Sequence, residues 1–519
     1  MKSIKRPVAL VLTILIAISL FTSCNNVEDN VDSITRKGKI TLSWDFNVKK
    51  DVWQAIADEY IKVNPEVEIV IDQKDGSSYA TWLSNQLSSA EPTPDIVINN
   101  EVKQFMADKK FVDYSQYLGK KNPYAGNQVW RETLDEMAYQ ANGSNQEIYS
   151  LNTDSVMTTW FYNKDIFAKY NLDPPKTWDE LITISKTLKS NGIIPLAIAG
   201  DAMSFWAWQM GWIFRVYTDQ YFRDYEDKII AQPGDYNYDK ELQSDWKFDK
   251  SDKLNDNQKG YIVNLIRFAK MVNDGETGPN TEKFKDMVVN LKKFFPEYVP
   301  SGFIGTDNTT AVQYFIKGEA AMWIDLASFG AGFERTMSDA GTNKFNLGVF
   351  NYPAMTSDKV GVDYARTTGG ASGSFGVVAK SKEQNDLVMD FMMFSASPEG
   401  QKVYFNKMEE LNIAPTGPSL VKGVKMPEKW ASTFEQLGVP GLADSNPYAA
   451  FSRGFMDTPK SVRDFQDNSQ LLFDNKMTVE EYCKQMQASC VTNIKTWLKI
   501  KGYRPDALDD PKADPLIKQ

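Results

Sequence analysis

The chain contains no histidine and only three cysteines. Histidine is the side chain best suited to moving protons near neutral pH and is the commonest metal ligand. Its absence excludes histidine-based acid–base catalysis and histidine-ligated metal sites. We therefore expect neither a metal nor a cofactor.

Positive charge is also scarce, since 58 Lys and Arg residues face 68 Asp and Glu residues, a formal net charge of −10. Proteins that bind nucleic acids carry a basic face, so we expect no nucleic acid as a partner. The composition is otherwise that of a folded globular protein, with 42% hydrophobic residues. At 519 residues the chain is long enough for two or more lobes.

The N-terminus carries an apolar run, Val8–Leu20, that follows three basic residues. The run is too short to span a membrane comfortably and is typical of a secretory signal. It ends in LFTSC, which resembles the bacterial lipobox with Phe21 where leucine is usual. We predict that residues 1–23 are a signal peptide of the lipoprotein type and that Cys24 is lipidated; an ordinary signal with an incidental cysteine is the alternative. Residues 24–37 are then a polar tether.

The other two cysteines, Cys483 and Cys490, lie in TVEEYCKQMQASCVTNIKTWLKI, which has the pattern of one helix. Seven residues of helix separate their Cα atoms by roughly 10 Å, which is beyond the reach of a disulfide. A bond between them would need a break in the helix near Ala488. The spacing therefore predicts two buried free thiols.

The first half of the chain alternates strand and helix patterns. KITLSW (39–44) and EVEIVID (66–72) have the period of two that strands show, and DIVIN (95–99) is a short continuous apolar strand. Amphipathic helices that end at prolines separate them. A β-α-β-α-β order of this kind predicts a parallel, doubly wound sheet of the α/β class.

The stretch NKDIFAKYNLDPPKTWDEL (163–181) predicts a helix, a rigid turn at Pro174 and Pro175, and a second helix over 177–190. Thr177 and Glu180 have the spacing of a capping box, as do Ser381 and Gln384 later in the chain. Residues 215–300 are polar and predict an insertion. TAVQYFIKGEAAMWIDL predicts a helix, a glycine stop and a strand, SGSFGVVAK predicts another strand, and the chain from about Pro427 is mostly helical.

Several segments in order resemble the bacterial extracellular solute-binding proteins of the type that includes maltose-binding protein, which are receptors of ABC sugar importers. They are ITLSW, SYATWLSNQLSSAEPTPDIV, the WFYNKD…PPKTWDEL…PLAIAG block, AVQYFIKGEAAMWID and GGASGSFGVVAKSKEQNDLVMDFMMFSASPEGQ, together spanning most of residues 38–405. The resemblance implies a two-lobed periplasmic-binding-protein fold, type II-like, with doubly wound sheets joined by a multi-strand hinge and a helical C-terminus. It implies that lobe 1 is residues 38–155 and 371–424, that lobe 2 is residues 156–370 and 425–519, and that Trp178 is a core residue.

Ligands of open α/β sheets sit outside the carboxyl ends of the strands. That rule selects polar and aromatic residues in the loops after the predicted strands, and the resemblance implies the same loops. Just after the segment AAMWIDL, members of the family often have a tryptophan that stacks on the ligand. This chain has Ser328 and Phe329 there. The candidate ligand-binding residues are Asp45, Phe46, Asn99, Asn100, Asp154, Thr158, Asp201, Trp206, Trp208, Asp325, Phe329 and Gly370.

Each candidate also has a structural alternative. Asp45 and Asp201 are good helix N-caps. Trp206 and Trp208 would point to opposite sides of an extended segment, so only one of them is expected in the cleft. Asp325 ends a buried strand, where a satisfied core acid is unusual. Trp44 lies on an apolar strand face and is expected in the core, while Gly369 and Gly370 serve backbone conformation first.

These residues suit a sugar, because carboxylates and amides pair with vicinal hydroxyls and an indole covers the C–H face of the ring. The resemblance implies a non-enzymatic, monomeric lipoprotein, anchored through Cys24 on the extracytoplasmic side, that closes on a carbohydrate and delivers it to ABC permease transmembrane subunits. A secreted glycoside hydrolase is the alternative, but it needs two facing carboxylates, and no such pair is recognisable. A sensory sugar receptor is a third interpretation.

Overall fold

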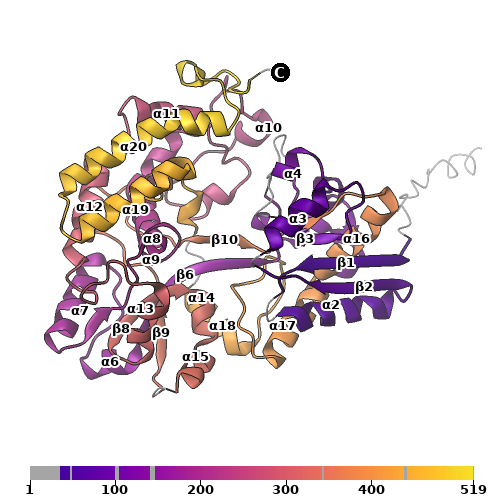
Figure 1. Ribbon diagram of the computed structural model, residues 1–519, viewed down its shortest axis with the longest axis horizontal. Helices are drawn as coiled ribbons and strands as arrows, with labels where there is room; N and C mark the ends of the chain where they lie inside the picture. The colour runs from indigo at the N-terminus through magenta and orange to yellow at the C-terminus, as the bar shows by residue number, and fades with distance from the viewer. Residues whose placement is uncertain are drawn as a thin grey trace, which may run out of the picture.

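The computed structural model describes residues 35–46, 49–76, 78–99, 104–140, 147–341, 344–437 and 441–517. The predicted signal peptide, Cys24 and Asn100 lie outside them. The described chain forms two bodies side by side, each built on its own sheet, and the strands β6 (Asp154–Asn163) and β10 (Gly369–Ser372) run across the middle between them (Figure 1). Within the described part, no helix is both long enough and apolar enough to cross a bilayer.

The first sheet has the strand order β11-β3-β1-β2. Strands β1 (Gly38–Trp44), β2 (Val67–Gln73) and β3 (Ile96–Ile98) are parallel, as the alternating pattern predicts, and β11 (Phe375–Val377) adds to β3 in the antiparallel sense. Ile40 and Leu42 are fully buried, which accounts for the period of two in β1. SGSFGVVAK thus forms a shorter strand than predicted.

Helices pack around the first sheet, and Tyr60 and Phe391 stack edge-on between two of them, with ring centroids 5.2 Å apart. The helices of this body are α2 (Lys50–Val63), α3 (Tyr79–Ser88), α4 (Gln104–Ala107), α5 (Ser115–Leu118), α16 (Lys382–Ser395) and α17 (Pro398–Glu410).

The second sheet has the order β10-β6-β8-β7, and β9 (Leu347–Phe350) also pairs with β6. Strand β7 (Ile194–Leu196) is parallel to β8 (Ala320–Leu326), whereas β6 is antiparallel to β8, β9 and β10. The first residues of β6, from Asp154 to Met157, pair with β10, and its last residues pair with β8 and β9. A bridge between Leu151 and Phe375 fixes the chain just before β6 to the first sheet.

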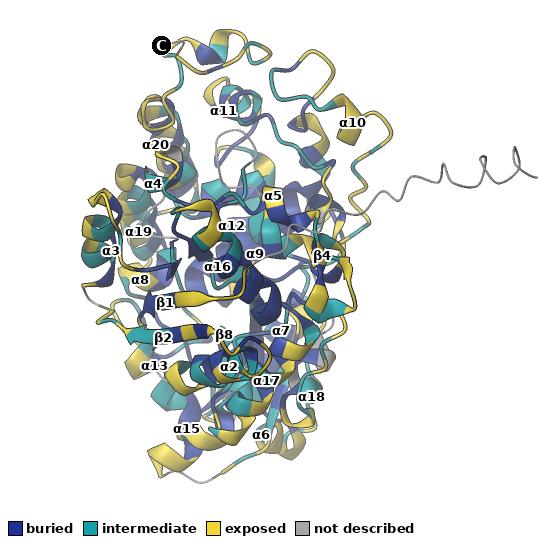
Figure 2. Ribbon diagram, turned by 90° about the vertical axis from the view of Figure 1, so that its right-hand side faces the viewer, coloured by how far each residue is buried: buried dark blue, intermediate teal, exposed yellow. Residues whose placement is uncertain are grey.

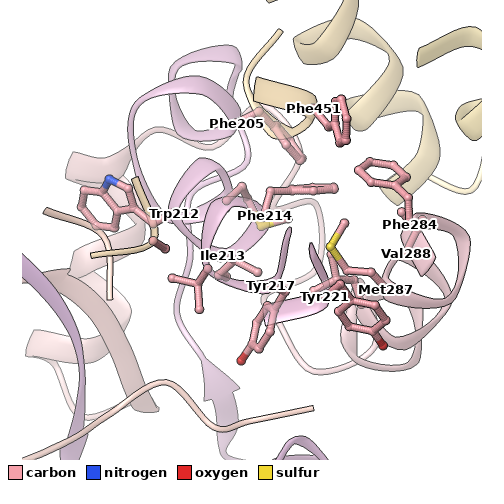
Figure 3. Packing of buried hydrophobic residues seen from close by; sticks show 14 of the residues in the cluster. Phe205, Trp212, Ile213, Phe214, Tyr217, Tyr221, Phe284, Met287, Val288 and Phe451 are labelled. Atoms are coloured by element: carbon pink, nitrogen blue, oxygen red, sulfur yellow. The ribbon is translucent and has the colours of Figure 1, made fainter. Parts of the chain in front are cut away.

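The second body is rich in helices, and α9 (Gln209–Phe222) lies at its centre. Every residue of α9 is buried, and Figure 2 shows the helix dark blue inside the molecule. Phe214, Tyr217 and Tyr221 project from it towards side chains of α12 and neighbouring segments (Figure 3). The other helices of this body are α6 (Lys164–Lys169), α7 (Trp178–Ser190), α8 (Ala202–Trp206), α10 (Lys240–Gln243), α11 (Leu265–Asn273), α12 (Glu282–Phe294), α13 (Asn308–Ile316), α14 (Ala327–Ala331), α15 (Phe333–Ala340), α18 (Glu428–Leu437), α19 (Pro459–Phe473) and α20 (Val479–Ile500).

The predicted insertion, 215–300, begins inside α9 rather than at the surface. The polar residues at its start are buried in ion pairs, since Asp219 accepts two hydrogen bonds from Arg366, at 2.8 and 2.7 Å. Arg366 also pairs with Asp256 at 2.7 Å, and Arg223 pairs with Glu226 at 3.1 Å. The polar residues at the start of this stretch therefore form a buried charge network.

Local predictions made from short motifs are confirmed. Thr177 and Glu180 form the reciprocal capping box that begins α7, and Trp178 is 1% exposed. The exception is the box predicted for Ser381 and Gln384. Ser381 caps α16 by accepting from the Gln384 backbone N–H, but the Gln384 side chain does not reach back to Ser381 and donates to the Lys39 carbonyl at 2.8 Å instead. Cys483 and Cys490 lie in the single helix α20 as buried free thiols.

Helix α18 sits where the two bodies meet. Its Trp430 and Phe434 belong to the core around the first sheet, together with Ala327 of α14, although all three residues fall in the range predicted for lobe 2. Helix α18 and the start of α14 therefore contribute side chains to the core of the first body.

Candidate functional site

The carboxyl ends of two pairs of parallel strands bring the candidate residues together in two groups. In the first sheet β1 neighbours β3, with Leu42 opposite Ile96, and in the second sheet β7 neighbours β8, with Leu196 opposite Met322. Strand β1 points towards the middle of the molecule, where β6 and β10 pass (Figure 1). The loops that follow these strands are where a ligand of an open α/β sheet is expected.

After β1, Asp45 is exposed and its Oδ1 accepts a 2.8 Å hydrogen bond from Gln73 Nε2. It does not cap a helix, because the N-cap of α2 is Lys49. Phe46 is only 3% exposed and stacks on Trp44 with ring centroids 4.0 Å apart. Trp44 is itself buried, as predicted. Asp45 is therefore the accessible candidate of this loop.

After β3, Asn99 is fully buried and both ends of its amide are paired. Its Nδ2 donates to the Tyr149 carbonyl at 2.8 Å, and its Oδ1 accepts from Ser150 Oγ at 2.7 Å. Asn99 thereby fixes the segment that leads into β6. Asn100 lies outside the described residues.

Asp154 opens β6 and keeps one oxygen available. Its Oδ2 accepts a 2.7 Å hydrogen bond from the Tyr404 hydroxyl and lies 3.7 Å from Lys49 Nζ. Its Oδ1 is buried, and no described group pairs with it. Burial and the nearby Asp154 carboxylate raise the pKa of Tyr404 well above its usual value, so the hydroxyl stays a donor. A ligand hydroxyl that reached Oδ1 would satisfy this carboxylate.

Thr158 lies in the middle of β6 and ties the crossing strands together. Its Oγ1 is 2.8 Å from Thr368 Oγ1 and 2.9 Å from the Tyr352 hydroxyl. Its backbone N–H donates to the Thr368 carbonyl at 3.0 Å. These bonds occupy the hydroxyl and join β6 to the residues that precede β10.

After β7, Asp201 caps α8 by accepting a 2.8 Å hydrogen bond from the Ser204 backbone N–H. Trp206 ends this helix and Trp208 is the N-cap of α9, so the two are not in an extended segment. Trp208 packs edge-on against Trp212, with centroids 5.6 Å apart. Trp206 is half-buried, and its buried Nε1 has no partner among the described residues.

Asp325 lies near the carboxyl end of β8, opposite Thr159 of β6. Its Oδ2 accepts from Trp323 Nε1 at 2.9 Å, and its Oδ1 accepts from the Leu326 backbone N–H at 2.7 Å. Burial nevertheless raises the pKa of Asp325 to about 6. A neighbouring side chain, Gln209, donates to the Ile324 carbonyl at 3.2 Å, while its buried Oε1 is unpaired within the described chain.

Phe329, in α14, belongs to an aromatic cluster. Its ring lies 5.2 Å from that of Phe161 and 5.8 Å from that of Phe333, and the side chain is half-buried. Most of its surface therefore contributes to packing beneath β8.

A cavity of about 740 Å³ lies between the two bodies, with β10 at its edge. Gly370 lines it, which places that candidate at the interface. Gly369, which the sequence analysis placed beside it, lines the cavity as well. The remaining lining residues were not predicted from the sequence: Leu118, Arg131, Glu136, Met137, Tyr139, Gln140, Ile148, Leu242, Asp256, Gln258, Lys259, Tyr261, Ile262, Ala371, Leu442, Asp444 and Ser445. Those from 118–148 come from short irregular segments, which have no periodicity that a sequence pattern could detect.

A contact across this cavity joins the bodies, since Lys259 Nζ lies 3.8 Å from Glu136 Oε1. Within the second body, the Gly369 backbone N–H at the cavity edge donates to Asp444 Oδ2 at 3.0 Å. A second cavity of about 760 Å³ lies by the start of β7, near Ile194, Pro296 and Asn475. That is the opposite end of the strand from the candidate residues, so the interface cavity is the better candidate site.

A family model described as "Bacterial extracellular solute-binding protein" matches residues 47–402. A "Multiple sugar-binding protein" of Streptococcus mutans is 25% identical over 187 residues, which are 35% of this chain and 40% of the relative. The matched stretch thus spans about two fifths of that protein.

Solved structures agree on the fold over most of the chain. A family 1 extracellular solute-binding protein from Bifidobacterium longum subsp. infantis has a TM-score of 0.57 at 15% identity, covering 88% of this chain and 99% of that one. RafE in complex with raffinose has a TM-score of 0.53 at 16% identity, with the same coverage. The predicted two-lobed periplasmic-binding-protein fold is therefore confirmed.

Proposed function

Because the chain belongs to the bacterial extracellular solute-binding proteins, we propose that it binds a sugar or oligosaccharide between its two lobes and delivers it to an ABC importer. Membership confirms the resemblance drawn from the sequence and makes the protein a binding protein, not an enzyme. The Streptococcus mutans relative is named for sugar binding, and the RafE structure holds raffinose. These two names support a saccharide as the ligand.

The observation that carries the proposal is a set of buried polar atoms left unpaired at the start of β6 and in the two helices that follow β7. They include a donor, Trp206 Nε1, and two acceptors, Gln209 Oε1 and Asp154 Oδ1, none of which has a hydrogen-bond partner in the described chain. A buried polar atom without a partner costs about 1–3 kcal/mol. A polyhydroxylated ligand donates and accepts at neighbouring hydroxyls and would satisfy atoms of both kinds.

The proposed movement is closure of lobe 1 (38–155 and 371–424) on lobe 2 (156–370 and 425–519) about β6 and β10. Few segments cross between the lobes, and a hinge needs only a few residues to absorb the change. The residues proposed to contact the ligand are Asp45, Phe46, Asn99, Asn100, Asp154, Thr158, Asp201, Trp206, Trp208, Asp325, Phe329 and Gly370. Of these, Asp45 is exposed, and Asp154 and Trp206 each have a buried polar atom without a partner among the described residues.

We also propose that the mature protein is a monomeric lipoprotein, held on the extracytoplasmic side by a lipid on Cys24, with ABC permease transmembrane subunits as its partner. The sequence LFTSC supports the anchor. Replacement of Cys24 by serine is expected to release the protein from the membrane fraction into the medium or periplasm.

A thermal-shift screen tests the ligand class. A ligand that binds only the folded state raises the melting temperature. At a hundredfold excess over Kd it adds about 2.7 kcal/mol to the free energy of unfolding. We expect at least one saccharide, in a panel that includes raffinose, xylo-oligosaccharides and chitin oligosaccharides, to raise it with a saturating dose dependence. The proposal would be overturned if amino acids or short peptides raised the melting temperature and no saccharide did.

A further inference from the structure

The interface cavity is lined by five charged side chains, four of which are in ion pairs. Asp444 pairs with Arg215 at 2.9 Å, and Asp256 pairs with Arg366 at 2.7 Å. The third pair, Glu136 with Lys259, spans the cavity at 3.8 Å. Every carboxylate in the lining therefore has a basic partner.

The fifth charged residue, Arg131, has none. No hydrogen bond or ion pair to its side chain exists within the described chain, and its Nε is buried without a partner. Its position is fixed by its neighbours in a short 3-10 helix, Trp130–Thr133, where Trp130 is fully buried and Thr133 Oγ1 donates to the Trp130 carbonyl at 2.7 Å. The cavity thus holds one guanidinium that has no hydrogen-bond or ion-pair partner among the described residues.

An unpaired guanidinium has a specific chemistry. Its planar fork of N–H donors matches the oxygens of a carboxylate, sulfate or phosphate and commonly binds them through two parallel hydrogen bonds. A neutral sugar can satisfy the N–H groups but leaves the charge unbalanced. Uncharged groups around it, such as Tyr139, Gln140 and Ser445, can pair with hydroxyls.

We propose that the saccharide bound by this protein is acidic, and that its anionic group pairs with Arg131. This inference rests on the proposed function, because it concerns the ligand of the same interlobe cleft. The chain as a whole carries a net charge of −10, which disfavours anions at long range. Recognition of an acidic sugar therefore depends on this local, partly buried contact.

Matched pairs of saccharides test the proposal by isothermal titration calorimetry. Trigalacturonic acid is compared with galactotriose, and galactose 6-sulfate and galactose 6-phosphate are each compared with galactose. We expect at least one acidic member to bind about 10- to 100-fold more tightly than its neutral match, the range for hydrogen bonds to a charged group. The pair with the largest ratio identifies the anion as carboxylate, sulfate or phosphate.

Three variants assign the preference to Arg131. R131Q removes the charge and should abolish the preference for the acid, while R131K keeps the charge without the fork and should retain part of it. R335Q is the control, because Arg335 is an exposed arginine of α15 that pairs with Asp339 and does not line the cavity. Since no hydrogen bond or ion pair within the described chain involves the Arg131 side chain, R131Q should fold with an unchanged melting temperature.

The outcomes are distinguishable. Neutral saccharides that bind as tightly as their acidic matches would overturn the inference and leave the proposed function standing. An acid preference that R131Q preserves would also overturn it, because another group would then hold the anion. Binding of neither kind would remove the proposed function and this inference together.

Discussion

The indole Nε1 of Trp323 donates a 2.9 Å hydrogen bond to Asp325 Oδ2, two residues along β8 and on the same side of the strand. Together with the Leu326 N–H, it holds the carboxylate at the edge of the second sheet. Even with both bonds, burial raises the pKa of Asp325 to about 6, from 3.8. Burial therefore links the stability of the folded protein to the ionisation of Asp325.

The first prediction concerns that link. Between pH 3.8 and 6 the folded protein keeps a proton that the unfolded chain has released, so the contribution of Asp325 to stability is present below pH 3.8 and is lost as pH rises through 6. The variant D325N does not titrate. It should gain stability relative to the wild type between pH 4 and pH 7, by up to about 2 kcal/mol after allowance for partial exposure.

Urea unfolding of both proteins at pH 4, 5, 6 and 7 measures this difference. Asn lacks one of the two acceptor oxygens, so D325N is expected to start below the wild type at pH 4; only the trend with pH is diagnostic. A difference in unfolding free energy that stays constant over this range would show that Asp325 titrates normally.

The second prediction separates the two tryptophans after β7. Trp206 has an unpaired, buried Nε1, whereas the half-buried Trp208 packs edge-on against the core residue Trp212. We expect W206A to weaken saccharide binding about tenfold or more with little change in melting temperature. We expect W208A to lower the melting temperature more than it weakens binding. Calorimetric titration and thermal unfolding of both variants decide it, and the reverse pattern would mean that Trp208 is the residue that meets the ligand.

The third prediction uses two adjacent glycines of β10. A Cβ atom on Gly369 would lie 2.0 Å from the Val156 carbonyl oxygen, but one on Gly370 would meet nothing within 4 Å. Both have nearly the same φ, +159° and +158°, so any backbone cost is shared. G369A should therefore separate β10 from β6 and lower stability by more than about 1 kcal/mol beyond G370A.

Chemical denaturation compares the two alanine variants directly. Equal losses would show that the backbone conformation, rather than the close approach of β10 to β6, requires glycine at both positions.

The fourth prediction concerns the buried charge network behind the cavity. Asp219 is the bidentate partner of Arg366, which immediately precedes the segment that leads into β10. D219A removes one of the carboxylates that pair with the buried Arg366 guanidinium. It should lower the free energy of unfolding by about 3–5 kcal/mol. E59A breaks an exposed pair with Lys62 and serves as the control, with an expected change within about 0.5 kcal/mol. A similar small change for D219A, measured by urea unfolding, would mean that the network contributes nothing to folding.

Sequence patterns predicted those features that depend on residues close together in the chain. The capping box of Thr177 and Glu180 needs only a spacing of three, and the free thiols of Cys483 and Cys490 follow from the geometry of one helix. The positions of the strand-end loops followed in the same way, because parallel strands with helical crossovers place their carboxyl ends at one edge.

The remaining features depend on partners that are distant in sequence. Arg366 and Asp219 are 147 positions apart, and nothing near either residue indicates the other. Asn99 was predicted to bind ligand because it follows a strand. In the structure both ends of its side-chain amide are hydrogen-bonded, to Tyr149 and Ser150. Arg131 lies in a stretch of short 3-10 helices without periodicity, and only the folded arrangement shows that it is unpaired.

Small-angle X-ray scattering tests the central claim, closure of the two lobes on a saccharide, most directly. The radius of gyration is measured without ligand and with a saturating amount of the saccharide that gives the largest thermal shift. The account predicts a decrease on binding that W206A shifts to higher saccharide concentration. A radius of gyration that does not change when the cleft is saturated would contradict it.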